Sequence, residues 1–583
     1  MKFVVASMLV VSVAAAADGL AQEPTYARDI APLAADRCTM CHHAGGSAPF
    51  GLTTYSDVKR HATQIAQVTR ARLMPPWKAD PADGPFVGQH PLTDAEIALI
   101  DRWVTGGEAE GNISDAPRVQ RWPDGWQVGT PDLVVSIPTP YTLQASGTDV
   151  FRIFVIPLPV DRTRFVRGLE FRPGNARVVH HANIRLDRTP ASRQLDDADP
   201  GPGYSGLMLR SAQYPDGHFL GWTPGQIAPL VPKGLAWRLD PHTDLVVEIH
   251  MQPSGKDESV QPSIGLYFSD EPPTATPAML RLGRQNIDIP AGTSRYTVTD
   301  SYVLPVDVDV EAVQPHAHYR ARDVRGTATL PDGSTRTLIH IRDWDFRWQH
   351  VYRYVEPFAL PKGTTLAMEY TYDNSTSNVR NPEHPPKRAR WGQRSSDEMG
   401  DLWVQVLPRS EDDLVKLVRD FRPKVAAEDA IGCEMEIERH PSDAALHDDA
   451  AMLYLELSRF EDAIRHFRAA LALKPDSAVA HYNVGTALTL ARRLDEAAQE
   501  YQAALRIDPD YPKAHNNLAS IWLSQQKYDD AIREFEIVVR LQPDSISALE
   551  NLAAAYAAAG QPDRAAEIRA RRDTLLRQKR PPE

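Results

Sequence analysis

The sequence predicts a multidomain protein with a small α-helical domain, two all-β antiparallel sandwich domains and a C-terminal α-solenoid. Three patterns lead to this prediction: a helical segment around a Cys pair, short alternating runs between turn residues, and a 34-residue repeat. The length of 583 residues corresponds to roughly four domains. The net charge of −13 argues against a nucleic-acid partner, because such a partner needs clustered positive charge.

Residues 1–21 have the pattern of a secretory signal peptide. Lys2 precedes an apolar run that extends from Phe3 to Ala17, and small residues precede Gln22. We therefore expect cleavage near residue 21 and a periplasmic or secreted protein. Later in the sequence no stretch approaches the ~20 apolar residues that a membrane-spanning helix needs, so no membrane span is predicted.

Residues 23–110 are predicted to form the small helical domain, followed by a polar linker over 111–131. The domain carries the motif Cys38-Thr39-Met40-Cys41-His42. Its last helix is predicted to begin after Thr93, a favourable N-cap, and to end at Gly106-Gly107.

The Cys-x-x-Cys-His motif offers two thiols for thioether bonds to haem and an adjacent imidazole for the iron. A thioether is a common sixth ligand, so Met74, which precedes a proline, is the predicted distal residue. The region resembles class I cytochromes c, which implies one covalently bound haem c held by Cys38, Cys41, His42 and Met74. The alternatives are a redox-active Cys pair or half of a zinc site, and a packed core methionine at 74. We expect the neighbouring His43 to be exposed.

Residues 132–275 and 276–425 are predicted to be β-rich. Short alternating runs such as residues 150–156 and 245–250 are separated by Pro, Gly and Asp. Helices and strands do not alternate along these segments, which favours antiparallel sandwiches over a parallel sheet.

Histidines in these two regions form two candidate metal sites. His316 and His318 lie on the same face of a predicted strand, because side chains alternate with period two. With Met399 they would make a soft ligand set that favours copper. The adjacent His180 and His181 can share a metal only at a bulge or strand end.

Together with a further histidine of this region, the pair would be enough for an all-imidazole site. His250 follows an alternating apolar run, whereas His242 lies in a turn and is the weaker candidate.

The two histidine groups and the string Ser395-Ser396-Asp397-Glu398-Met399 resemble the copper type II, ascorbate-dependent monooxygenases. This is the family of peptidylglycine hydroxylating monooxygenase and dopamine β-monooxygenase. The resemblance implies an enzyme, a copper type II monooxygenase that acts on paired donors. It would use O₂ to hydroxylate a C–H carbon of a small molecule or peptide. It also implies two jelly-roll sandwiches with one copper ion each.

The resemblance also divides the roles of the two sites. His180, His181 and His250 would hold the electron-transfer copper, and His316, His318 and Met399 the catalytic, O₂-activating copper. Electrons would come from ascorbate or another one-electron donor, or from the fused haem domain. The animal relatives are rich in disulfides. This chain departs from them, because it has three cysteines, of which Cys433 has no predicted role.

Three positions around the second site concern the substrate. Where the peptide-amidating branch has Arg, Asn and Tyr, this chain has Gln314, Asp401 and Trp403. The loss of Arg and the presence of an acid disfavour a bound carboxylate, so a glycine-extended peptide is not expected. Asp401 could pair with an amine or be a solvated loop residue.

Residues 444–579 contain four predicted tetratricopeptide repeats, preceded by a linker or helix over 426–443. The prolines of successive repeats are 34 residues apart: Pro441, Pro475, Pro509 and Pro543. Small residues occupy the first-helix position of each repeat: Ala451, Gly485, Ala519 and Ala553. Such a solenoid presents a concave surface for a protein partner.

A second hypothesis needs no catalysis. The chain could be a non-catalytic periplasmic copper and haem protein for redox sensing or electron transfer, whose repeats dock a partner. A sensor needs only one metal site, so two complete ligand sets favour the enzyme.

Overall fold

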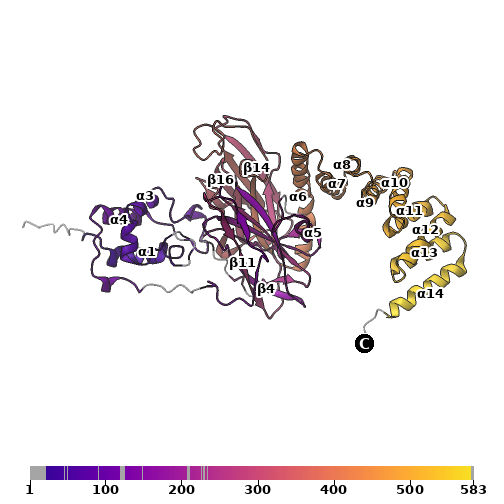
Figure 1. Cartoon of the computed structure of the whole chain (residues 1–583), viewed down its shortest axis with the longest axis horizontal. Coiled ribbons are helices and arrows are strands. Elements are labelled where there is room, and N and C mark those ends of the chain that lie inside the picture. The colour runs from indigo at the N-terminus through magenta and orange to yellow at the C-terminus, as the bar shows by residue number, and fades with distance from the viewer. Residues whose placement is uncertain are drawn as a thin grey trace, which may run out of the picture. The chain divides into compact units, whose positions relative to one another are not determined.

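In a computed structural model of the chain, helices are followed by a large β-region and then by further helices (Figure 1). The structure describes residues 22–44, 46, 48, 50–89, 91–118, 125–147, 149–205, 211–224, 226, 230–232 and 234–578, so the predicted signal peptide lies outside them. The chain forms two compact units. The first comprises Met1–Trp77, Gly88–Tyr214 and Leu220–Pro272, and the second comprises Lys78–Val87, Pro215–Phe219 and Pro273–Glu583.

The N-terminal region is helical, as predicted. Its elements are η1 (Tyr26–Ile30), α1 (Ala31–Arg37), α2 (Tyr55–Arg60), α3 (Ala62–Arg70), η2 (Pro81–Asp83), α4 (Asp94–Thr105) and η3 (Ile113–Asp115). The predicted cap of α4 is confirmed: the Thr93 hydroxyl accepts from the Glu96 backbone, and the Glu96 carboxylate accepts from the Thr93 backbone. Tyr26, Ile100 and Trp103 are buried in the core of this region.

The first β-region follows at residues 133–269. Its strands are β1 (Leu133–Ser136), β2 (Tyr141–Leu143), β3 (Val150–Pro157), β4 (Arg164–Arg172), β5 (Val179–Asp187), β6 (Ala212–Gln213), β7 (Gly221–Trp222), β8 (Trp237–Leu239), β9 (Asp244–Met251), β10 (Glu258–Val260) and β11 (Ser263–Ser269). They form the sheets β1-β11-β4-β8 and β3-β9-β5-β6, with β7 beside β5, and the pair β10-β2. Buried residues of both larger sheets, such as Phe154 and Leu266, share one apolar core.

Two short helical segments interrupt these strands. They are α5 (Ala191–Ala198) and η4 (Pro215–Gly217). The alternating sequence pattern predicts neither of them.

The second β-region covers residues 278–408. Its strands are β12 (Ala278–Gly283), β13 (Asp288–Ile289), β14 (Tyr296–Val303), β15 (Val308–Ala317), β16 (Ala321–Thr329), β17 (Thr335–Ile341), β18 (Tyr352–Leu360), β19 (Thr365–Tyr372), β20 (Ala389–Arg390) and β21 (Gly400–Pro408). The sheets are β12-β21-β15-β18 and β14-β19-β16-β17, with the pair β13-β20. Along β14 every second residue is buried from Val298 to Tyr302, which is the predicted period of two.

A long helix, α6 (Glu411–Arg439), follows β21 and contacts β12 and β21. It begins well before residue 426, where the predicted helix starts, so the predicted end of the β-region at 425 is wrong. Ser410 caps it and three acidic residues fill its first turn, a strong start signal. Pro423 within the helix hides this continuity from sequence reasoning.

Eight further helices form four successive pairs, which Figure 1 shows side by side along the C-terminal part. They are α7 (Ala444–Glu456), α8 (Phe460–Leu473), α9 (Ala478–Leu490), α10 (Leu494–Ile507), α11 (Pro512–Ser524), α12 (Tyr528–Leu541), α13 (Ile546–Ala558) and α14 (Pro562–Gln578). The predicted small residues, among them Ala451 and Ala519, are buried where the helices of a pair meet.

Residues 78–87 depart from the predicted domain limits. They fall within the predicted helical domain 23–110 but belong to the second compact unit. Their partners lie more than 250 residues later in the chain, so no local pattern could predict the contact. None of the described helices is long and apolar enough to cross a membrane.

Candidate functional site

Three imidazoles meet in the first β-region. His180 and His181 lie on β5 and His250 on the neighbouring β9, and their ligating nitrogens are all within 4.8 Å of one another. The pairing of β5 with β9 shifts between Val179 and His181, so the chain bulges at His180. The bulge brings both adjacent histidines to the same side, as the sequence argument requires.

His250 is the buried member of this three-histidine cluster. Its Nδ1 lies 3.4 Å from Nδ1 of His181, and its Nε2 lies 3.0 Å from the Asp149 carboxylate. The ring of Phe151 stacks on His250 with centroids 4.3 Å apart. Because Asp149 accepts from Nε2, the tautomer is fixed and Nδ1 is the nitrogen that would bind a metal.

Asp149 is a functional candidate that sequence reasoning missed. It precedes β3, and the pairing of β3 with β9 places Phe151 opposite His250. The hydrogen bond from His250 lowers the pKa of Asp149, so the carboxylate stays charged beside the cluster. Three imidazoles with a carboxylate behind one of them fit a copper ion.

The second donor set lies in the second β-region. His316 is on β15, and His318 directly follows it, with ring centroids 5.3 Å apart and planes at 89°. Nδ1 of His316 contacts the Gln349 side-chain oxygen, and Nδ1 of His318 lies 3.2 Å from the Asp397 carbonyl. Since both Nδ1 atoms are engaged by oxygen acceptors, a metal would be bound through Nε2 of each ring.

The segment that carries Met399 is bonded to His318. The buried Glu398 carboxylate accepts backbone hydrogen bonds from His318 at 2.6 Å, from Arg320 at 3.0 Å and from Met399 at 3.0 Å. Burial raises the pKa of Glu398 to about 7 against the effect of these donors. Met399 itself is half-buried. Two imidazoles and a thioether on mutually bonded segments fit a soft metal such as copper.

The predicted substrate residues lie beside this set. In the pairing of β15 with β21, Gln314 is opposite Trp403 and His316 is opposite Asp401, so all four face the same side of the sheet. Asp401 is buried, which raises its pKa, and the nearby charge of Arg281 on β12 opposes that rise. Asp401 therefore has a cationic neighbour within the protein already.

The Cys-x-x-Cys-His motif occupies a single turn after α1. The backbone N–H groups of Cys41 and His42 both donate to the Cys38 carbonyl, at 3.2 and 3.0 Å. Burial raises the pKa of the Cys38 thiol to about 12, whereas a redox-active cysteine needs a lowered one. Nδ1 of His42 lies 3.0 Å from the Phe50 carbonyl, which directs Nε2 to an iron.

These features fit a covalently bound haem. Met74 is half-buried, and its backbone N–H donates to the Val68 carbonyl at the end of α3. The expectation that His43 is exposed is wrong: it is 7% exposed, and its Nδ1 lies 2.8 Å from the Ala44 carbonyl.

Comparisons with known proteins concern the repeats. A family model described as tetratricopeptide repeat matches residues 449–512, and a second with the same description matches 488–552. The C-terminal helices are tetratricopeptide repeats, as predicted.

No curated protein matches the chain. Among solved structures, a crystal structure of MamA is 21% identical, with a TM-score of 0.26, over 26% of this chain and 90% of that chain. A MamA structure from Desulfovibrio magneticus RS-1 is 18% identical, also with a TM-score of 0.26, over 28% and 92% of the two chains.

Proposed function

We propose that the protein is an exported copper-dependent monooxygenase that hydroxylates a C–H bond of a small molecule or peptide with O₂. In this proposal it acts in the periplasm or outside the cell. The two β-regions are the jelly-roll sandwiches of a copper type II monooxygenase, and the N-terminal region is a cytochrome c domain that carries one haem c.

The observation that carries the proposal is the second donor set. Glu398 bonds the backbones of both His318 and Met399, so one buried carboxylate joins the two chain segments that carry the imidazole and the thioether. The three-histidine cluster supplies the other site that a two-copper enzyme requires.

The chain's own residues have distinct tasks in this proposal. Asp149 fixes the tautomer of His250, and Gln349 and the Asp397 carbonyl fix those of His316 and His318. Copper held by these rings would supply O₂ binding and one-electron chemistry. The repeats offer a docking surface for a protein partner.

The substrate class follows from the charges near the second site. Gln314 and Asp401 replace the cationic and neutral groups that would hold a carboxylate, which disfavours glycine-extended peptides. The Arg281 charge beside Asp401 weakens the case for an amine, so a substrate without a carboxylate is favoured.

The test is the copper content of protein matured with a c-type haem assembly system. We expect about two copper ions per haem in the wild type, and about one in Met399→Ala and in His180→Ala. Met452→Ala and His384→Ala are matched controls at exposed positions and should keep both ions. With both sites filled, O₂ uptake in a substrate screen follows.

The alternative is a non-catalytic copper and haem protein for redox sensing or electron transfer, whose repeats dock a partner. The tetratricopeptide repeats favour it, since partner docking is their general role. One copper ion per haem that is lost in His180→Ala and kept in Met399→Ala would support this alternative over the enzyme.

A further inference from the structure

Two segments of the chain have the Asn-x-Ser/Thr pattern of an acceptor for an asparagine-linked oligosaccharide. They are Asn112-Ile113-Ser114 and Asn374-Ser375-Thr376, and the sequence contains no third such segment. The pattern is short, so the surroundings of each asparagine decide whether it can serve as an acceptor. The structure places the two asparagines in opposite surroundings.

Asn112 lies on the surface of the helical region. It follows α4 and caps the short η3, and residues 109–115 are all exposed. Ile113, the middle residue of the motif, is 60% exposed, so the motif is not packed against the core. An attached oligosaccharide is bulky and polar and must remain in solvent, so exposure is the first requirement of an acceptor. Asn112 meets this requirement.

The hydrogen bonds of Asn112 leave its amide nitrogen available. The side-chain oxygen accepts from the Ser114 backbone N–H at 3.3 Å, and the Asn112 carbonyl accepts from the Asp115 N–H at 2.9 Å. Among the described residues, no acceptor is bonded to the amide nitrogen, and the Ser114 hydroxyl has no bonded partner either. The two groups that define the motif are therefore accessible together.

The chain that leads to Asn112 is fixed to the helical core. The Tyr26 backbone N–H donates to the Ala109 carbonyl at 2.8 Å. Gly111 has a φ of +76°, and a Cβ there would lie 2.6 Å from the Thr25 hydroxyl oxygen, so glycine is required at this bend. The motif is thus presented on a fixed base, and no unfolding is needed to reach it.

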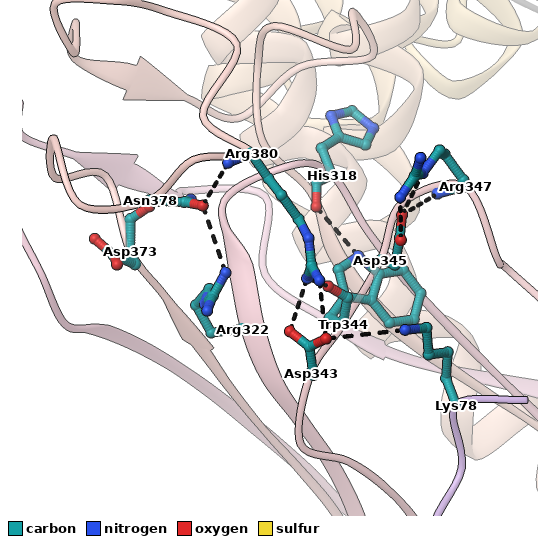
Figure 2. A network of polar contacts seen from close by, with 10 residues as sticks. All are labelled: Lys78, His318, Arg322, Asp343, Trp344, Asp345, Arg347, Asp373, Asn378 and Arg380. Carbon is teal, nitrogen blue, oxygen red and sulfur yellow. Dashed lines mark hydrogen bonds and ion pairs between the residues drawn. The ribbon is translucent and has the colours of Figure 1, made fainter. Parts of the chain in front are cut away.

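Asn374 is buried in the second β-region. It is 0% exposed, and its amide nitrogen donates to three backbone carbonyls, at 3.1, 3.1 and 2.8 Å. These carbonyls belong to Ile289, Pro290 and Lys387. The segment is held further on, where the Asn378 side-chain oxygen accepts from the Arg380 backbone N–H at 3.0 Å and from the Arg322 guanidinium at 3.5 Å (Figure 2). The Asn374 nitrogen is therefore closed to modification while this region is folded.

We propose that Asn112 is an acceptor of an asparagine-linked oligosaccharide, and that Asn374 is none in the folded protein. The inference rests on the export that the proposed function includes, because secreted proteins carry this modification. The donor is an oligosaccharide whose anomeric carbon is joined to a lipid diphosphate. The Asn112 nitrogen bonds to that carbon and loses one proton, and the bond from the carbon to the phosphate oxygen breaks. The lipid diphosphate leaves with the electron pair, so nothing is oxidised or reduced.

The acceptor can be tested on the purified, folded protein. The probe is an oligosaccharyltransferase that requires no residue outside Asn-x-Ser/Thr, supplied with its lipid-linked donor, and the readout is the mass of the tryptic peptides. We expect one oligosaccharide on the peptide of residues 103–118 and none on Asn374. A free peptide of residues 370–380 should be modified by the same enzyme, because only burial protects Asn374 in the protein.

Substitutions of Ser114 separate an acceptor from a structural cap. Ser114→Ala removes the hydroxyl of the motif but keeps the backbone N–H that bonds to Asn112, so the turn is preserved. We expect Ser114→Ala to reduce the transfer about tenfold or more, and Ser114→Thr, which retains the pattern, to keep it. Asp115→Asn, at the exposed position next to the motif, is the matched control and should leave the transfer unchanged. Equal modification of the wild type and Ser114→Ala, or an unmodified Asn112 in the wild type, would overturn the inference.

The outcomes separate this inference from the proposed function. A protein that fails the copper-content test and still accepts the oligosaccharide at Asn112 supports this inference and removes the proposed enzyme. A protein with two copper ions per haem and an unmodified Asn112 overturns this inference and leaves the proposed enzyme standing.

Discussion

Substitution of Glu398 tests whether one carboxylate holds the second donor set together. Its Oε1 accepts from the backbones of His318 and Met399, and its Oε2 accepts from that of Arg320. Glu398→Gln retains one oxygen and can keep the two hydrogen bonds to Oε1. The new amide NH₂ group then faces the Arg320 backbone N–H. Both groups are donors, so the Arg320 N–H loses its acceptor.

The geometry sets the expected magnitudes. One buried N–H without an acceptor costs about 1–3 kcal/mol, so Glu398→Gln should destabilise the second β-region by that amount. Glu398→Ala leaves three such groups, for roughly 3–9 kcal/mol on the same scale. The exposed Glu356 on β18 is the matched control, and its change to Gln should stay within about 0.5 kcal/mol.

The assay is urea denaturation of metal-free protein, with hydrogen exchange read on peptides from β15 and β21. This readout isolates the second β-region from the other parts of the chain. We also expect the Ala variant to lose one copper ion per haem, because His318 and Met399 are no longer held together. Equal stability of the Gln and Ala variants, or a Gln variant as stable as the control, would refute the reasoning.

Three further predictions concern other parts of the chain. Asp149→Asn should weaken copper binding at the three-histidine cluster about 10–100-fold in a competition titration, because the imidazole loses its orienting carboxylate. Gly485→Ala should lower the stability of the repeats by about 1–3 kcal/mol in urea, since the new Cβ would lie 2.8 Å from the Tyr501 ring. Burial lowers the pKa of His515, but the hydrogen bond to Glu534 outweighs this effect, so the pKa is raised overall. The folded repeats therefore bind more protons than the unfolded chain and should lose stability as pH rises above about 6.5.

Each of these three predictions would be contradicted by a specific result. Asp270→Asn, at an exposed position, should leave copper binding unchanged. If it weakens copper binding as much as Asp149→Asn does, Asp149 does not support the cluster specifically. An unchanged urea midpoint for Gly485→Ala would mean that Tyr501 moves aside freely. Glu534→Gln should flatten the pH dependence, and a slope that survives this change must come from other groups.

Local patterns predicted much of the fold. The capping box at Thr93, the period-two burial of β14 and the 34-residue spacing of the repeats all follow from short-range rules that the structure obeys. The need for a bulge at His180 could also be predicted, because two adjacent side chains on a regular strand face opposite ways.

The residues that hold the two donor sets in place could not be predicted from the sequence, since their partners are distant along the chain. Asp149 is recognisable only once β3 pairs with β9, and Glu398 only once its segment folds against His318. Residues 78–87 have a Pro- and Gly-rich sequence that suggests a loop, whereas their burial depends on strand edges far along the chain. Pro423 similarly conceals the long helix α6, which is stabilised by its contacts with β12 and β21.

The surroundings of the two donor sets differ in a way that matters for copper. His250 gives its Nε2 to a charged carboxylate, which strengthens Nδ1 as a donor and favours the cupric ion. The rings of His316 and His318 give their Nδ1 atoms to neutral oxygens of Gln349 and Asp397. With the thioether of Met399 as the proposed third ligand, this set would favour the cuprous ion. In the proposed enzyme, the first set would therefore suit an ion that exchanges electrons, and the second a reduced ion that meets O₂.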